Sequence, residues 1–264
     1  MDADFPWETV HASVNRGGGT PSQDQVAIRL VAGSALVLCA ADGHGAPDAR
    51  RGHLGARWAV EETMRCIVPF ARRVAHAEND PKRWPELAER AARLRVEIRL
   101  SLRERARMHE ANGPAGAPAA VDAPIDVPID AAFEKRSLLG AVLSRRLLFC
   151  WQAGPGEIAL IGEQGCQVLF EHEPEPYGRM LLHWQAADEL GARRLVLLST
   201  DGLSYGLSDR SAYRAFAEAL YARLARREAQ DVRDSLDGWL RALAERSGED
   251  ASLVAAYLAE EQQL

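Results

Sequence analysis

The sequence contains few cysteines, no long apolar run and no surplus of basic residues. Its four cysteines, Cys39, Cys66, Cys150 and Cys166, form no C-x-x-C pair, and three of them lie in apolar surroundings. Buried free thiols are therefore expected rather than a zinc site or a disulfide framework. The longest nearly apolar stretch, residues 30–41, is well short of the roughly 20 residues that a membrane helix needs.

The N-terminus is acidic and lacks the positive and apolar regions of a secretory signal. A cytoplasmic protein without a membrane partner is the expectation. The 32 Lys and Arg residues against 38 Asp and Glu residues give a formal charge of −6. This balance argues against a protein that coats nucleic acid, because that role requires a basic face.

Ordinary proportions of hydrophobic (47%) and charged (27%) residues exclude disorder of the whole chain. The 264 residues are enough for one large domain or two small ones. The ordered motifs described below favour a single domain over residues 1–264.

The spacing of apolar residues predicts strands and helices in a definite order. Residues 24–31 and 35–41 predict two strands joined by a tight turn, and two helices are predicted from about residue 53 and over 85–109. Short apolar runs then predict an antiparallel meander over 137–144, 147–153, 157–162 and 166–171. A strand at 193–200, two helical stripes and a last strand at 251–258 complete the chain. This order favours an α+β fold, a layered sandwich, over alternating βαβ units.

Two segments carry no catalytic motif. Arg and Glu alternate along the predicted helix 85–109, so a solvated helix face is favoured there over a nucleic-acid-binding or membrane-binding surface. Residues 111–130, rich in Pro, Ala and Gly, predict a surface linker or a partly mobile loop, with a flap over the cleft as the alternative.

Aspartates stand at the ends of the predicted buried strands. Asp42 and Asp201 each follow a strand and precede a glycine, and Asp24 and Asp250 each stand at the start of a strand. Any one of them alone suits a turn or a helix cap. Carboxylates gathered at the rim of a sheet repel one another, and this repulsion is relieved by hard divalent cations such as Mg²⁺ or Mn²⁺.

These motifs, in this order, resemble those of the PP2C (PPM) metal-dependent protein phosphatases. The sequence D-G-H-G at 42–45 resembles the family's first acidic motif, S-T-D-G-L at 199–203 its second, and E-D-A-S at 249–252 its terminal motif. Residues 19–24 resemble the G-x-P-N-Q-D opening of the bacterial branch, and 137–142 occupy the place of the family's G-[ST]-T strand. The resemblance implies a central antiparallel β-sandwich flanked on each side by a pair of helices, in four layers.

The resemblance also implies a two-metal phosphomonoesterase with assigned residues. Asp42 would bridge two Mn²⁺ or Mg²⁺ ions, the Gly43 carbonyl would bind one of them, and Asp201 and Asp250 would complete the other site. Asp24 would act directly or through metal-bound waters. Two ions lower the pKa of a shared water for in-line attack on phosphorus. His44 would protonate the departing Ser or Thr oxygen as general acid, although a turn histidine without a chemical role is the alternative.

Two positions depart from the family pattern. Pro155 stands where an aspartate ligand of an additional, weaker metal is expected, and Glu157 could compensate from two residues further on. Arg16 is the nearest candidate for a phosphate-binding arginine, but its spacing to Asp24 differs from that of the family, and a solvated loop arginine is the other interpretation.

The leading hypothesis is therefore a bacterial-type phosphatase that removes phosphate from Ser or Thr of a protein partner, with a cognate kinase or its target among the candidate partners. The alternative is a weakly active or inactive PP2C-fold protein that binds phosphoproteins or acts as a scaffold. The two departures, at Pro155 and Arg16, motivate that alternative.

Overall fold

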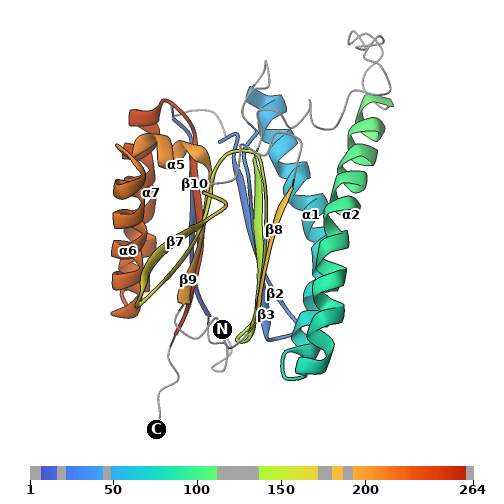
Figure 1. Cartoon of the computed structure of the whole chain (residues 1–264). Helices are drawn as coiled ribbons and strands as arrows, with labels where there is room; N and C mark the ends of the chain where they lie inside the picture. The colour runs from blue at the N-terminus through green and yellow to red at the C-terminus, as the bar shows by residue number, and fades with distance from the viewer. Residues whose placement is uncertain are drawn as a thin grey trace.

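Two five-stranded sheets are packed face to face, and helices cover both outer faces, which gives four layers (Figure 1). The structure is a computed structural model that describes residues 7–16, 22–43, 49–111, 137–171, 180–186 and 193–259. The predicted α+β sandwich with helices on both sides is confirmed. No helix within these ranges is long and apolar enough to cross a membrane.

The first sheet joins strands from both ends of the chain. Its order is β1 (Trp7–Val14), β10 (Ala251–Leu258), β9 (Arg193–Ser199), β6 (Glu157–Gly162) and β7 (Gly165–Leu169). The second sheet has the order β2 (Gln25–Val31), β3 (Ala35–Ala41), β4 (Leu138–Leu143), β5 (Leu147–Ala153) and β8 (Leu181–Ala186). All neighbouring strands are antiparallel.

The helices cover the sheets through the apolar stripes that the sequence predicts. Helices α1 (Ala49–Ala77) and α2 (Trp84–Ala111), separated by the short 3₁₀ helix η1 (Pro81–Arg83), pack on the second sheet. Helices α5 (Asp201–Gly206), α6 (Arg210–Ala225) and α7 (Ala229–Ser247) pack on the first sheet. Burial of one apolar face per helix is the main source of stability for such elements.

Strand β3 is apolar on both faces, because one face packs against the other sheet and the opposite face packs against the helices. All seven of its residues are buried. Leu36, Leu38 and Ala40 point into the core between the sheets, whereas Val37 and Cys39 point into the core under α1 and α2. This alternation follows from the two-residue period of a strand. All four cysteines are free thiols; Cys39 and Cys150 are buried as predicted, and Cys66 and Cys166 are half-buried.

The predicted meander is wrong in one respect, because the chain changes sheets in its middle. Strands β4 and β5 belong to the second sheet, but β6 and β7 belong to the first, so β5 and β6 do not pair. The crossover lies at residues 154–156, where Gly154 and Gly156 have positive φ angles of 79° and 113°. A Cβ atom on Gly156 would lie 2.7 Å from the Ser199 carbonyl oxygen, so only glycine fits there.

Four elements were not predicted from the sequence: β1, β8, the 3₁₀ helix η1 and the short helix α5. Each edge strand is only partly buried, and its apolar residues do not alternate cleanly. Strand β1 is nevertheless fully paired with β10, from Trp7 opposite Leu258 to Val14 opposite Ala251. Strands such as these are specified by their partners rather than by their own pattern.

Candidate metal and active site

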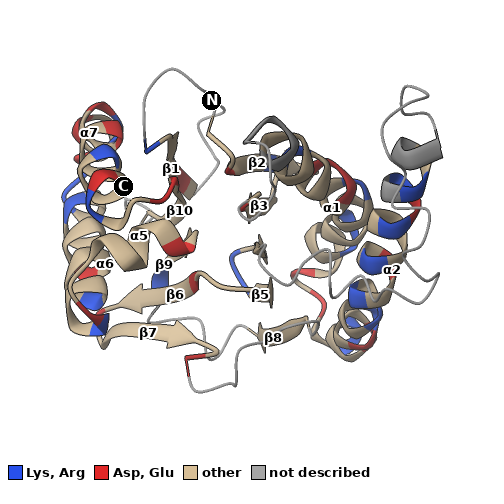
Figure 2. Cartoon of the chain, turned by 90° about the horizontal axis from the view of Figure 1, so that it is seen from above, with Lys and Arg blue, Asp and Glu red and all other residues tan. Residues whose placement is uncertain are grey.

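The strand registers bring the predicted acidic residues to one end of the sandwich. Gln25 pairs with Ala41 in the second sheet. Asp24 directly precedes Gln25 and Asp42 directly follows Ala41, so the two aspartates lie at the same end of that sheet. In the first sheet Ser199 pairs with both Leu253 and Glu157. This register places Asp201, Asp250 and Glu157 at the same end of the sheet. Figure 2 looks along the strands and shows the two sheets facing one another, with α5 beside the first.

Asp24 is held from the opposite sheet and keeps one oxygen unpaired. Its side chain is buried, and its Oδ2 accepts a hydrogen bond from the Thr200 hydroxyl over 2.7 Å. Thr200 Oγ1 in turn accepts a hydrogen bond from the Ser252 backbone N–H over 2.9 Å. Among the residues that the structure describes, Asp24 Oδ1 is buried and has no hydrogen-bond partner. A buried carboxylate oxygen without a partner is costly, so it marks a place where a cation or a proton fits.

The surroundings of Asp24 disfavour its charged form. The pKa of Asp24 is raised from 3.8 to about 6; burial is the largest cause, and the negative charge of Asp250 acts in the same direction. Polar contacts with Asp42, Thr200 and Ser252 act in the opposite direction. A nearby divalent cation would reverse this balance, because it stabilises the carboxylate directly.

Asp42 and Gly43 are fixed by backbone bonds to their neighbours. The Asp42 N–H donates to the Ser137 carbonyl over 3.1 Å, and the Gly43 N–H donates to the Gln23 carbonyl over 3.2 Å. Asp42 is itself buried. These bonds extend the β3–β4 pairing by one residue and the β2–β3 pairing by two residues beyond the strands, which holds the Asp42 carboxylate beside Asp24.

Asp250 accepts hydrogen bonds from two places in the segment between β1 and β2. Its Oδ1 accepts the Arg16 N–H over 3.0 Å, and its Oδ2 accepts the Gln23 N–H over 2.6 Å. The Ser22 hydroxyl also contacts Oδ2, over 3.4 Å. Each carboxylate oxygen has two lone pairs, so these bonds leave acceptor capacity for a cation.

Asp201 forms a second acidic pair, with Glu157. Asp201 is half-buried and begins α5, and its negative charge acts on Glu157 at the start of β6. The pKa of Glu157 is raised to about 7; burial is the largest cause, and the negative charge of Asp201 acts in the same direction. Glu157 Oε2 is buried without a hydrogen-bond partner among the described residues.

Gly202 lets α5 approach the terminal motif. A Cβ atom on Gly202 would lie 1.9 Å from the Asp250 carbonyl oxygen, which no real side chain tolerates. The glycine after Asp201 is therefore required by the close approach of the two acidic segments, rather than by a positive φ.

The Arg16 guanidinium is directed toward the end of α7 rather than toward the aspartates of the site. It donates to the Gly248 carbonyl over 2.7 Å and lies 3.5 Å from Glu249 Oε2, at the C-terminal end of α7. The side chain is 47% exposed. The predicted general acid His44 lies outside the described residues, as does nearly all of the predicted loop 111–130.

Several residues around the site were not singled out from the sequence. The hydroxyl of Ser252 donates to Ser13 over 2.7 Å, and Ser13 donates to Ser22 over 3.1 Å. His53 of α1 contacts the Ser22 carbonyl through Nδ1 over 2.8 Å. Thr200 and Ser252 are part of the quoted motifs, but single serines and histidines elsewhere carry no such signal.

The acidic residues fit divalent cations as pairs rather than as one closed cluster. In the described part of the chain, no three His, Cys, Asp or Glu side chains are grouped as ligands of one ion. Oxygen-only donors with room for water suit Mg²⁺ or Mn²⁺, which keep several water ligands. Asp24 Oδ1 and Glu157 Oε2, which have no hydrogen-bond partner in the described part of the chain, mark two positions where a cation would fit.

Comparisons with known proteins agree with this architecture. The structure is similar to the serine/threonine phosphatase Stp1 from Staphylococcus aureus, with a TM-score of 0.57, 13% sequence identity and 98% of each chain covered. It is also similar to a serine-threonine phosphatase 2C from Toxoplasma gondii, with a TM-score of 0.60, 13% identity and 96% of each chain covered. A bacterial serine phosphatase gives a TM-score of 0.59 at 14% identity, with 97% of this chain and 99% of that chain covered.

These identities establish a shared fold only. No curated protein matches the sequence. The sequence profile described as Protein phosphatase 2C matches residues 13–241, which include Asp24, Asp42 and Asp201 but not Asp250. The chain therefore belongs to the protein phosphatase 2C family.

Proposed function

We propose that this protein is a metal-dependent phosphomonoesterase that removes phosphate from phosphoserine or phosphothreonine of a partner protein. The observation that carries the proposal is the meeting of Asp24, Asp42 and Asp250 at one end of the sandwich, with Asp24 Oδ1 buried and unpaired. Family membership supports a phosphatase fold. The activity itself, the metals and the residue roles are the proposal.

Asp42 with the Gly43 carbonyl, and Asp201 with Asp250, are the proposed metal ligands, and Asp24 is proposed to act directly or through water. When bound, two Mn²⁺ or Mg²⁺ ions would supply an activated water and the positive charge that stabilises in-line attack on phosphorus. The chain's own groups orient these ligands. Thr200 fixes Asp24, and the backbone N–H groups of Arg16 and Gln23 fix Asp250. His44 is proposed to donate the proton to the leaving oxygen.

Glu157 is proposed to take the place of the aspartate that Pro155 lacks. Its carboxylate is buried beside Asp201, and its Oε2 has no partner in the described structure. The proposal places an additional, weaker cation between Glu157 and Asp201. Pro155 itself lies in the crossover between the sheets and has no side-chain donor.

The test is hydrolysis of p-nitrophenyl phosphate and of a phosphothreonine peptide at increasing Mn²⁺ concentration. We expect turnover that depends on Mn²⁺ and that falls at least about 100-fold in Asp42→Asn. Asp234→Asn, an exposed aspartate of α7, is the matched control and should leave turnover unchanged. A parent chain no faster than Asp42→Asn would overturn the proposal.

The second candidate is a phosphoprotein-binding or scaffold protein with little activity. Both oxygens of Asp250 already accept hydrogen bonds, and the Arg16 guanidinium is directed toward the end of α7 rather than toward the aspartates of the site. This candidate predicts binding of the phosphothreonine peptide without turnover. Rapid hydrolysis of the same peptide would exclude it.

A further inference from the structure

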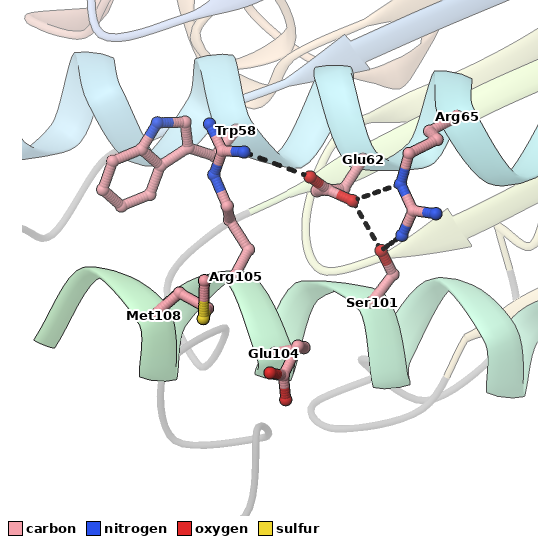
Figure 3. A pocket seen from close by; sticks show the side chains of 7 residues that line it. All are labelled: Trp58, Glu62, Arg65, Ser101, Glu104, Arg105 and Met108. Atoms are coloured by element: carbon pink, nitrogen blue, oxygen red, sulfur yellow. Dashed lines mark hydrogen bonds and ion pairs between the residues drawn. The ribbon is translucent and has the colours of Figure 1, made fainter. Parts of the chain in front are cut away.

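A groove runs between the two helices of the outer layer that covers the second sheet. Two hollows of about 480 and 670 Å³ lie there, one lined by α1 from Trp58 to Arg65 and the other from Arg65 to Pro69. They share Arg65, Ser101 and Glu104, so they form one continuous surface, which we call the α1–α2 groove. Figure 3 shows the side chains that line the first of the two hollows. Along α2 the groove extends from Arg90 to Met108, which at 1.5 Å per residue is about 27 Å.

The floor of the groove is a satisfied polar network. Glu62 has a side chain only 11% exposed, and its Oε2 accepts hydrogen bonds from the Ser101 hydroxyl over 2.6 Å and from Arg65 Nε over 2.8 Å (Figure 3). Arg105 lies 3.5 Å from the other Glu62 oxygen, and its guanidinium is 5.6 Å from the centre of the Trp58 ring. These contacts tie α1 to α2, so the groove is a preformed surface.

The rim of the groove differs from its floor, because it carries two arginines without an ion pair in the described part of the chain and several exposed apolar side chains. Arg103 and Arg107 form no ion pair with any residue that the structure describes. Leu100 is 57% exposed and Met108 is 54% exposed, and Val96 continues the row at 52%. Their spacing of four and eight residues keeps this row along one side of α2.

The charge of this layer is opposite to that of the whole protein. Helices α1 and α2 together carry 13 arginines and seven glutamates, a surplus of six positive charges in a chain of net charge −6. Figure 2 shows these basic residues spaced along both helices. A cationic, partly aliphatic groove on an acidic protein complements a segment that is acidic on its flanks and aliphatic along one face.

We propose that the α1–α2 groove docks an acidic amphipathic helix of a partner protein. Aliphatic residues of that helix pack on Leu100 and Met108, and its carboxylates pair with Arg103 and Arg107. The row of exposed aliphatic side chains favours a polypeptide over RNA, which is bound through stacked bases and phosphate contacts. Two glutamates, Glu97 and Glu104, line the same groove beside these arginines.

The test uses a fluorescein-labelled 18-residue peptide with leucine at every third or fourth position and glutamate beside each leucine. We expect fluorescence anisotropy to show saturable binding to the full chain. The double variant Arg103→Glu/Arg107→Glu should weaken binding at least about tenfold, because two attractive charge pairs become repulsive. The matched control Arg72→Glu/Arg73→Glu changes the same charge at exposed positions of α1 outside the groove and should bind as the parent does.

Further measurements separate the proposed partner from other occupants. Leu100→Ser should also weaken binding, and far-ultraviolet circular dichroism should confirm that each variant is folded. Equal binding by parent, Arg103→Glu/Arg107→Glu and control, or binding only of oligouridylate RNA or of phosphatidylserine vesicles, would overturn the proposal. Peptide binding that appears only after residues 112–136 are replaced by Gly and Ser would assign the groove to the chain's own segment, and would equally overturn it.

Discussion

The Thr200 hydroxyl donates its only proton to Asp24 Oδ2 over 2.7 Å and so joins the end of β9 to the start of β2 in the opposite sheet. Thr200 Oγ1 also accepts a hydrogen bond from the Ser252 N–H, and an ionised carboxylate can only accept, so the Thr200 hydroxyl is the donor to the Asp24 carboxylate. Asp24 is thereby held with Oδ1 unpaired. Thr200 is thus a positioning residue of the proposed site.

Two replacements of Thr200 should therefore separate the contribution of its hydrogen bond to stability from the contribution of its packing. Thr200→Val keeps the shape of the side chain but leaves the Asp24 oxygen unpaired, so we expect a loss of about 1–3 kcal/mol in the free energy of unfolding. Thr200→Ser keeps the hydroxyl and should lose less than about 1.5 kcal/mol. Urea denaturation measures both, and calorimetric titration with Mn²⁺ should show weaker binding for Thr200→Val only. Equal Mn²⁺ affinity in the two variants would contradict the positioning role.

The raised pKa values of Asp24 and Glu157 predict that the metal-free protein loses stability as the pH rises. Each carboxyl holds its proton more tightly in the folded state, so its contribution falls between its unfolded and folded pKa. These windows are 3.8 to about 6 for Asp24 and 4.5 to about 7 for Glu157. Above them the cost is on the order of 3 kcal/mol for each group.

This pH effect is measured by urea denaturation in a chelator at pH 5.5 and pH 8. The parent should be less stable at pH 8, and Asp24→Asn should be more stable than the parent at pH 8 because it removes a buried charge. Saturating Mn²⁺ should reverse that order. A parent equally stable at both pH values would show that these carboxyls do not carry the penalty.

Because Gly202 lies close to the Asp250 carbonyl, a single methyl group added at position 202 should strongly lower the stability of the protein. Gly202→Ala should cost about 3 kcal/mol of stability, because the methyl group would lie 1.9 Å from a backbone oxygen and would push α5 away from β10. Gly238→Ala is the matched control, since Gly238 lies in α7 with no atom within 4 Å of the new Cβ. It should gain about 1 kcal/mol from helix propensity. Thermal unfolding of both variants measures the expected loss and the expected gain in stability.

The proposed role of Glu157 predicts rescue by the residue that the family pattern expects. Glu157→Gln should lower turnover about tenfold at limiting Mn²⁺. Adding Pro155→Asp to that variant should recover part of the loss by supplying a carboxylate from the neighbouring position. Single-turnover hydrolysis of p-nitrophenyl phosphate at varied Mn²⁺ measures both effects. If Glu157→Gln is as active as the parent at every Mn²⁺ concentration, the acid has no role in binding metal.

Local patterns were sufficient for most of the elements and for the positions of the acidic residues. The apolar runs of β3 and β9 and the helical stripes of α6 and α7 are signals within single segments, and each of these elements was predicted. The same local patterns predicted the positions of the four aspartates, because a residue close before or after a strand lies at the end of its sheet. These residues are Asp24, Asp42, Asp201 and Asp250.

Tertiary structure alone decided which strands share a sheet and which groups touch the aspartates. Strands β1 and β8 are specified by pairing with β10 and β5, and the crossover at residues 154–156 depends on which sheet accepts β6. The bond from Thr200 to Asp24 spans 176 positions in the chain and two different sheets. Such contacts form only when the packed cores bring distant segments together, so no local pattern of residues encodes them.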